Sequence, residues 1–388
     1  MTTRPRIRDL GYSPGRFTPG PKNSLLDVPG VTVGQVTIHT TPDIHTGLTV
    51  IFPRGIEKTR TLPCYGATHD LNGMGEMTGT HALNEWGFMN GPIALTNTLS
   101  VGKVYDGMFL WSLSEAAESG EDDIETMRRM NIPVVAETYD GLLNDISASV
   151  INKDTVLEAI KVSKVQSEIL EGNYGGGTGM RCHGYKGGTG TASRVVPGTD
   201  GNDYTLGVLV QANHGQKPDL RIGGVPVGEI LKKEEEGKGR SDELPVAGRA
   251  AEGSIIVVII TDAPLLPHQL RRIAQHAGIG IAQVGGHSAG RNFSGEIFLA
   301  LSTGTSPNEL ASQSSGFDYL PPLEAQKVET VKNEVIDSLF YATSEATEEA
   351  ILNALCKAET LTGFKGRTVE AMPVERVKEL LEKYMVRV

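Results

Sequence analysis

The sequence lacks several features that would assign a protein to a class directly. No stretch reaches the roughly 18 consecutive apolar residues that a membrane-spanning helix needs, so we expect no such span and no membrane partner. The three cysteines, Cys64, Cys182 and Cys356, are odd in number and have no metal-ligand spacing, which favours a reducing compartment. The basic N-terminus has no apolar segment behind it, so we predict no secretory signal and expect a cytoplasmic location.

Positive charge and cofactor motifs are also scarce. The formal net charge is −11 and there is no basic stripe, which argues against nucleic acid as the main partner. C-x-x-C and H-E-x-x-H are absent, and His81 and Glu85 form only one pair at helical spacing, so we assign no metal. The glycine-rich stretch 175–190 fails the P-loop pattern and no dinucleotide fingerprint occurs, so we expect no cofactor. That stretch either lines a site or only packs backbone against backbone.

Glycine is abundant instead, at 47 of 388 residues, and it separates short apolar runs. This pattern predicts strands joined by tight turns, over residues 31–38, 46–52, 91–98, 132–136, 206–213, 254–261 and 295–302. Periodic apolar residues predict helices from a cap at Asp154 to Gly172, from Pro267 to Gly278, and over 325–341, 345–360 and 374–385. Strands mixed with late helices indicate a layered α/β or α+β packing.

The most informative pair of residues is Gly253-Ser254. A charged segment at 231–243 precedes it, and the apolar run 254–261 that follows is typical of a strand buried on both faces. Cutting the bond between the two residues would give Ser254 a free α-amine with a pKa near ~7.7–8, able to act as base toward its own hydroxyl. Taken alone, the pair also fits an ordinary loop ahead of a strand.

A second serine lies in a better-known motif that we reject. Residues 286–290 match the nucleophile elbow G-x-S-x-G, with Ser288 at its centre. All nine histidines precede Ser288, whereas α/β-hydrolases place their histidine after the nucleophile. The sequence after the motif also reads as a turn and a strand where an elbow requires a helix, so a tight glycine turn accounts for it better.

Four further polar residues stand at the ends of apolar runs. Ser294 and Glu296 are two apart in a predicted strand and therefore face the same side. Asn213 ends another strand, where an amide is either a turn former or an oxyanion donor. Glu137 follows a third apolar run, where a carboxylate suits a cationic amine.

In combination these segments resemble the family of the L-aminopeptidase/D-Ala-esterase/amidases and the β-peptidyl aminopeptidases. The shared motifs follow one another along nearly the whole chain, at 27–34, 72–79, 92–98, 134–141, 186–194, 209–213, 253–254 and 294–296. The resemblance implies a single α/β domain, a four-layer αββα sandwich like that of N-terminal-nucleophile hydrolases but differently connected. It also implies self-cleavage into an α subunit, 1–253, ending in a flexible linker, 231–253, and a β subunit, 254–388, assembled as a homotetramer of αβ units.

The same resemblance implies roles for the candidate residues. Gly253 and Ser254 would form the cleavage site, and Ser254 would be the nucleophile. Asn213 would stabilise the oxyanion, and Ser294 and Glu296 would assist proton transfer. One departure is the run of glycines that starts at 175, which replaces the small apolar residues typical of the family and leaves the shape of the substrate pocket open.

For the substrate, the resemblance implies that Glu137 holds a free amine, with Tyr139 beside it. The implied reaction is hydrolysis of short peptides, amides or esters through an acyl-enzyme, with an L-α, D-α or β-residue released from the N-terminus. An acyltransferase of the ornithine-acetyltransferase type is one alternative, although its nucleophile is a threonine. An unprocessed, non-catalytic small-molecule binding protein of the same fold is the other.

Overall fold

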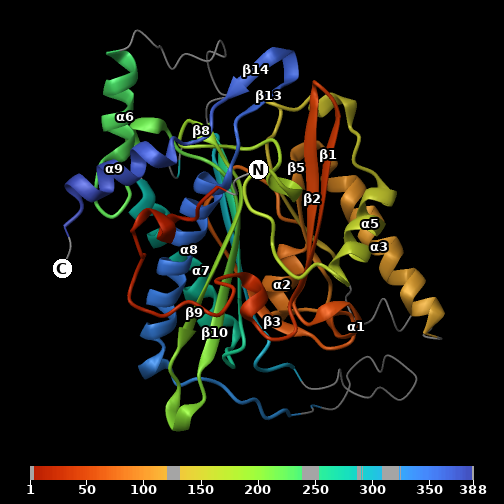
Figure 1. Ribbon diagram of the computed structural model, residues 1–388. Helices are drawn as coiled ribbons and strands as arrows, with labels where there is room; N and C mark the ends of the chain where they lie inside the picture. Colours follow the sequence, from red (N-terminus) through yellow and green to blue (C-terminus); the bar gives the residue numbers. More distant parts are fainter. Residues whose placement is uncertain are drawn as a thin grey trace.

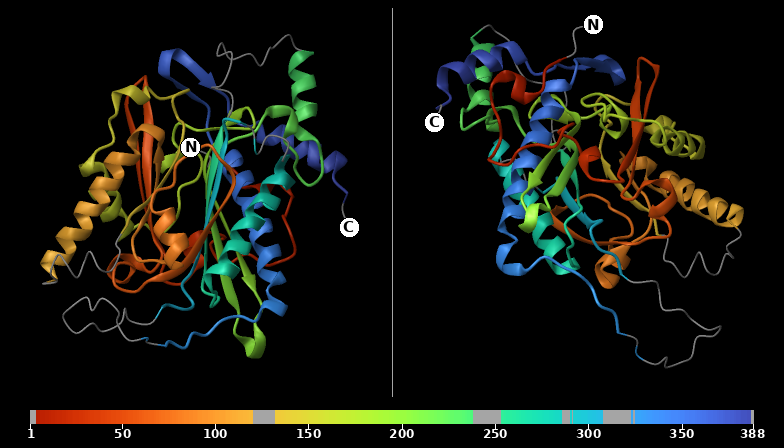
Figure 2. Two further views of the ribbon diagram at one scale, coloured as in Figure 1. Left: turned by 180° about the vertical axis from the view of Figure 1, so that it is seen from behind. Right: turned by 60° about the horizontal axis from the view of Figure 1, so that its bottom comes forward.

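A computed structural model describes residues 4–119, 132–237, 253–285, 290, 292–307, 323 and 325–386. Within these ranges, two β-sheets pack face to face and helices cover both outer faces, as Figure 1 shows from one side and Figure 2 from two others. The smaller sheet has the strand order β1-β2-β5-β6 and the larger one β4-β3-β12-β11-β10-β9. The expected four-layer αββα sandwich is therefore confirmed.

The smaller sheet carries two helices on its outer face. Its strands are β1 (Thr32–Thr41), β2 (Ile44–Phe52), β5 (Ile93–Asn97) and β6 (Val134–Thr138). The helices are α3 (Val101–Glu118) and α5 (Lys153–Ser163), and residues such as Phe52, Trp111 and Val156 form the apolar layer between helices and sheet. All four strands lie at or within a few residues of the predicted ranges.

The larger sheet carries the other two long helices. Its strands are β3 (Cys64–Gly73), β4 (Phe88–Met89), β9 (Gly188–Val196), β10 (Tyr204–Asn213), β11 (Ser254–Thr261) and β12 (Gly295–Ser302). The helices are α7 (Pro267–Gly285) and α8 (Asp337–Lys357). Shorter elements complete the described chain: α1 (Gly55–Thr59), α2 (Thr80–Trp86), α6 (Val227–Glu236), α9 (Val374–Tyr384), β7 (Arg181–Cys182), β8 (Tyr185–Lys186), β13 (Leu361–Gly363) and β14 (Arg367–Val369).

Strand β11 shows why the sequence forms two layers of core. Ile255, Val257 and Ile259 belong to the apolar cluster beneath α7 and α8, whereas Ile256, Val258 and Ile260 belong to the cluster between the sheets. Successive side chains of a strand point to opposite faces, so a continuous apolar run buries both. The strand predicted at 254–261 is thus confirmed, as is its burial on both faces.

Several predicted helix boundaries are wrong. Helix α5 is capped by Asn152, whose side chain accepts the N–H of Thr155 at 3.1 Å, rather than by Asp154, and it ends at Ser163 rather than at Gly172. Helix α7 runs through the predicted stop at Gly278, because Ile281 and Val284 beyond it remain in the core.

The two helices predicted at 325–341 and 345–360 are one helix, α8, which begins only at Asp337. Its neighbour α7 approaches it closely, since a Cβ at Gly280 would lie 2.5 Å from the Ser344 carbonyl oxygen. Helix α3 was not predicted, because Gly102 and Gly107 weaken its helical pattern.

The charged segment before Ser254 is partly helical. Residues 231–236, which we expected in a flexible linker, continue α6, and Leu231 is buried. Residues 238–252 of the expected linker, and Ser288 of the rejected elbow motif, lie outside the described residues. In the described part of the chain no helix combines the length and apolar character needed to cross a membrane.

Candidate active site

The sheet topology brings the predicted site residues to one end of the larger sheet. Ser254 is the first residue of β11 and pairs directly with Asn213, the last residue of its antiparallel neighbour β10. On the other side β12 runs parallel to β11, so that Glu296 pairs with Ile255 and the start of β12 lies beside Ser254. Residues that are 41 or more positions apart in sequence therefore meet at one point.

The hydroxyl of Ser254 is held at this point by the backbone of β12. The Gly295 N–H donates a hydrogen bond to Ser254 Oγ at 3.0 Å. The Ser294 hydroxyl contacts both the Gly253 carbonyl oxygen and Glu296 Oε1. Ser294 thus touches the carbonyl of the bond that precedes Ser254.

The Ser294 contacts form a directed chain of proton donors. A hydroxyl has a single proton, so when Ser294 donates it to the Gly253 carbonyl, Ser294 must accept a hydrogen bond from Glu296. Burial raises the pKa of the Glu296 carboxyl, which favours its protonated form. When Glu296 is protonated, Glu296, Ser294 and the Gly253 carbonyl form a relay that polarises this carbonyl.

Gly253 packs so closely against β10 that no side chain fits. A Cβ at this position would lie 1.6 Å from the Asn213 carbonyl oxygen and 2.6 Å from its carbonyl carbon. Real Cβ contacts at such distances do not occur, so a substitution must displace the Gly253 carbonyl from Ser294. The close approach to β10 therefore requires glycine at this position.

We expect Gly253→Ala to leave most of the chain uncut at 253–254, because the displaced carbonyl loses its contact with Ser294. Gel electrophoresis and intact mass spectrometry after purification measure the fraction cut. Gly102→Ala is the matched control, since a Cβ there meets nothing within 4 Å, and it should process as the unmodified chain does. Normal processing of Gly253→Ala would contradict this assignment of the cleavage site.

The amide of Asn213 has a fixed orientation. Its Oδ1 accepts the N–H of Arg181 at 2.8 Å, and its Nδ2 donates to the Tyr139 carbonyl oxygen at 3.0 Å. Because a backbone N–H can only donate, the oxygen must face Arg181. Among the residues that the structure describes, the second N–H of Nδ2 has no hydrogen-bond partner, so it can donate to a reacting carbonyl, as the oxyanion prediction requires.

Glu137 reaches the same end of the molecule from the smaller sheet. It lies in β6 and is 5% exposed, and its carboxylate accepts hydrogen bonds from the Glu76 N–H at 3.2 Å and from the Thr98 hydroxyl. A Cβ at Gly75 would lie 3.4 Å from Glu137 Oε1 and 3.6 Å from the Gly295 Cα, so these two atoms are at most 7.0 Å apart. Burial raises the pKa of the Glu137 carboxyl.

Tyr139 contributes its backbone more directly than its side chain. Its carbonyl oxygen accepts from Asn213, which ties the end of β6 to the end of β10. The ring is 46% exposed and folds over Gly141, where a Cβ would lie 2.3 Å from the hydroxyl oxygen. The predicted position of Tyr139 beside the amine site stays a prediction.

Several residues that were not among the predicted site residues hold the site together. Thr98 contacts Glu137, Asn72 Nδ2 donates to the Ser294 carbonyl, and the Arg181 N–H orients Asn213. Asn72 and Thr98 lie within the motif segments 72–79 and 92–98, so motif membership was the available signal. Their contacts join strands that are distant in sequence, which no local pattern shows.

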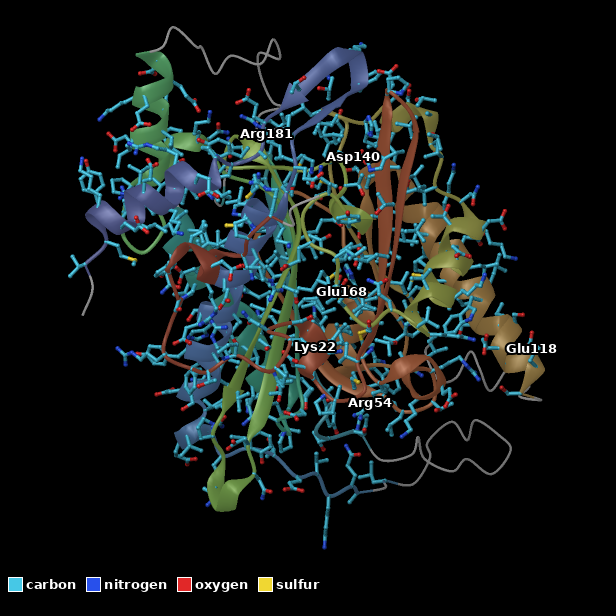
Figure 3. The ribbon with its side chains drawn as sticks, viewed as in Figure 1. Lys22, Arg54, Glu118, Asp140, Glu168 and Arg181 are labelled. Atoms are coloured by element: carbon cyan, nitrogen blue, oxygen red, sulfur yellow. The ribbon has the colours of Figure 1, made fainter. Side chains whose placement is uncertain are left out.

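The glycine-rich stretch combines both of the readings left open. Positions 175–177 are buried, and a Cβ at Gly176 or Gly177 would lie within 2.1 Å of Gln211 or Thr189 atoms, so these glycines serve close packing. Further along, Arg181 supplies the N–H to Asn213. Figure 3 shows Arg181 and Asp140 at the same end of the molecule.

Asp140, which lies just after β6, the strand that carries Glu137, should make the stability of the protein depend on pH. Its Oδ2 accepts from the Thr46 hydroxyl at 2.6 Å and from Asn97 at 3.1 Å, and burial raises its pKa from 3.8 to about 6. Between pH 3.8 and about pH 6 the folded state binds more protons than the unfolded state. The free energy of unfolding therefore falls as pH rises through this range, by about 3 kcal/mol in total from Asp140.

Asp140→Asn should remove this fall of the free energy of unfolding with rising pH. The test is denaturant unfolding of both proteins between pH 4 and 7, each in a Ser254→Ala background so that a single chain is compared. Parallel curves for the two proteins would contradict a raised pKa at Asp140.

Two facing sheets between helical layers, with a serine at the start of a central strand, define the class of N-terminal-nucleophile-like hydrolases. Comparisons with known proteins agree with this. The model of peptidase family S58 matches residues 23–369. The β-peptidyl aminopeptidase BapA of Sphingosinicella microcystinivorans is 43% identical over 392 residues, covering 98% of this chain and 92% of the relative. BapA of Sphingosinicella xenopeptidilytica is 39% identical over 388 residues, covering 97% of this chain and 91% of the relative.

Solved structures give the same result. The β-aminopeptidase of a Burkholderia species superposes with a TM-score of 0.82 at 39% identity, over 99% of this chain and 100% of that one. The L-aminopeptidase D-Ala-esterase/amidase of Ochrobactrum anthropi, described as a prototype of the serine aminopeptidases with a new variant of the Ntn-hydrolase fold, gives 0.81 at 38% identity, over 98% and 99% of the two chains. The chain belongs to peptidase family S58 and is a hydrolase of the aminopeptidase type, which confirms the resemblance drawn from the motifs.

Proposed function

We propose that the protein cuts its own chain between Gly253 and Ser254 and then releases N-terminal residues from short peptides, amides and esters. One observation carries this proposal: Ser254 stands at the start of β11 while the carbonyl before it contacts Ser294, which in turn contacts Glu296. A structural serine at the mouth of a strand needs no such relay on the preceding carbonyl.

Self-cleavage then follows from this geometry. Ser254 Oγ attacks the Gly253 carbonyl carbon, whose oxygen takes up negative charge and is stabilised by the Ser294 hydroxyl. The C–N bond breaks, its nitrogen gains a proton, and the acyl group moves to Oγ as an ester. Water hydrolyses this ester and leaves a carboxylate on Gly253 and a free α-amine on Ser254.

The free α-amine makes Ser254 the nucleophile for substrates. It takes the hydroxyl proton while Oγ attacks the substrate carbonyl, and it returns that proton to the leaving amine. The free N–H of Asn213 stabilises the oxyanion in this step. Water then hydrolyses the acyl-enzyme and releases the first residue.

The substrate's own ammonium group is bound by Glu137. A buried carboxylate at most 7.0 Å from the Gly295 Cα lies near the hydroxyl that attacks. A charge-assisted hydrogen bond to this carboxylate fixes the free amine, and an N-acyl group, which has no charge, loses it. The site therefore selects the free N-terminus of a substrate.

The test of self-cleavage is direct. We expect two fragments of about 27 and about 14 kDa from the 41.5 kDa chain, with the smaller one beginning Ser-Ile-Ile-Val, since activation by an α-amine requires this one cut.

A panel of p-nitroanilides of L-alanine, D-alanine, β-alanine and β-homo-amino acids assigns the preferred first residue, because relatives are named for both β-peptides and L-residues. Size-exclusion chromatography with light scattering tests the tetramer of αβ units.

Asn213→Ala should lower kcat of the processed enzyme by about 10²–10³-fold, with KM changing less, because one oxyanion donor is lost. Asn213→Asp is the informative partner variant. It keeps the acceptor for the Arg181 N–H and loses both N–H donors, so a similar fall in kcat separates oxyanion stabilisation from local packing. Full activity of Asn213→Asp would exclude the oxyanion role.

A further inference from the structure

A buried cluster of three potential metal ligands lies directly behind the candidate active site. Cys182 ends β7, His183 follows it, and His214 follows Asn213 at the end of β10. All three side chains are at most 1% exposed. Each offers one ligand atom, and these atoms lie within 4.8 Å of one another. None of the three has a part in the hydrolysis described above.

The hydrogen bonds of the cluster leave ring nitrogens unused. His183 Nδ1 lies 3.2 Å from the Gln216 carbonyl oxygen, so Nδ1 carries the proton and Nε2 has a lone pair. Nε2 of His183 has no hydrogen-bond partner among the residues that the structure describes, so its lone pair is available. Leaving a buried polar atom unpaired costs about 1–3 kcal/mol, so such atoms call for an explanation.

We propose that Cys182, His183 and His214 bind one Zn²⁺ ion or a similar thiophilic divalent cation. A thiolate with two imidazoles is a typical zinc donor set, and an imidazole bound to metal commonly donates its other N–H to a backbone carbonyl, as His183 does. The ion displaces the thiol proton of Cys182 on binding.

The distances fit a site that closes on its ion. Zn–S and Zn–N bonds of about 2.3 and 2.0–2.1 Å place sulfur and nitrogen about 3.6 Å apart in a tetrahedron. His214 would ligate through Nδ1, which already lies 3.8 Å from Cys182 Sγ. The widest pair, at up to 4.8 Å, must contract by about 1.2 Å if it joins sulfur and nitrogen and by about 1.5 Å if it joins the two nitrogens.

This contraction acts on the oxyanion residue. Cys182 follows Arg181 in sequence, and His214 follows Asn213. The orientation of the Asn213 side chain depends on its 2.8 Å hydrogen bond from the Arg181 N–H. The His183 N–H also donates to the His214 carbonyl at 2.7 Å, so both segments move together. A misplacement of about 1 Å in an active site can cost about 10²-fold in rate, so the bound ion should inhibit. The inhibition, unlike the binding, rests on the proposed function.

The binding test needs no substrate. Because the ligands are buried, the ion enters while the chain folds, so the protein is produced in metal-free medium with Zn²⁺ or Co²⁺ added and then dialysed. Elemental analysis should find one ion per chain, and the cobalt protein should show thiolate-to-cobalt charge-transfer absorption. Both should be lost in Cys182→Ser and retained in Cys356→Ser, which changes another buried cysteine outside the cluster.

A second variant keeps the test decisive if Cys182→Ser misfolds. If circular dichroism shows that Cys182→Ser does not fold, His183→Asn replaces it, because asparagine tolerates the left-handed φ of 46° at this position. Substoichiometric metal in the unmodified protein, or one ion retained in Cys182→Ser or its replacement, would overturn the site.

The rate measurement is separate. We expect the zinc-loaded enzyme to have a kcat/KM roughly 10- to 100-fold below that of the metal-free enzyme, with no such ratio in Cys182→Ser. Equal rates at full occupancy would overturn the coupling to Asn213. If the metal-free enzyme hydrolyses no substrate, the proposed function fails, while elemental analysis still decides the metal site.

Discussion

Ser254→Ala should remain a single chain of 41.5 kDa with no aminopeptidase activity above background. The substitution removes the attacking oxygen of both the self-cleavage and the turnover, and no α-amine is formed. Loss of a nucleophile lowers kcat by at least about 10³-fold. The fold should survive, because the hydrogen bond from Gly295 to Ser254 Oγ is worth only about 1 kcal/mol.

Mass spectrometry, N-terminal sequencing and hydrolysis of H-Ala-p-nitroanilide check this result together. Ser288→Ala is the control, since the motif around Ser288 fits a tight glycine turn better than a nucleophile elbow. This variant should be cut and should turn over substrate at close to the unmodified rate. An active preparation that runs as one uncut band would disprove the mechanism. A folded, processed but inactive Ser288→Ala would restore the nucleophile-elbow interpretation.

Glu137→Gln should be processed normally and yet hydrolyse H-Ala-p-nitroanilide about 10²-fold more slowly in kcat/KM. Self-cleavage presents no free amine, so the carboxylate is not needed for it. Turnover needs the charge, and a lost charge-assisted contact of about 2.7 kcal/mol corresponds to this factor. Glutamine keeps the shape and the acceptor for the Glu76 N–H, so local structure is preserved.

The pH profile gives an independent readout of the same residue. Burial raises the pKa of Glu137 above its usual value of 4.5, and only the ionised form binds an ammonium group. In the unmodified enzyme, kcat/KM should therefore fall more steeply below this raised pKa than protonation of the Ser254 α-amine alone requires, and Glu137→Gln should lack this added steepness. The unmodified enzyme should also refuse N-acetylated substrates. Equal rates on free and N-acetylated substrates would remove Glu137 from the amine site.

Much of the fold was predictable from local patterns. The apolar, β-branched run at 254–261 gave both the limits of β11 and its burial on two faces, because side chains alternate along a strand. Helix α9 was predicted within a residue from the stripe of Val374, Val377 and Leu381. The extent of α7 and the fusion of two predicted helices into α8 were not, because they depend on the tertiary burial of Ile281, Val284 and residues 342–346.

The sequence by itself determined the identity of the candidate residues, because the order of eight motifs assigned the family and each motif carried its own residues. Only the tertiary structure decided how they meet. Strand order places Ser254 between Asn213 and Ser294, and Gly75 brings Glu137 of one sheet near Gly295 of the other. The pairing of Cys182 and His183 with His214 is likewise invisible in sequence. Such contacts span tens of residues, and local periodicity carries no information about which distant strands become neighbours.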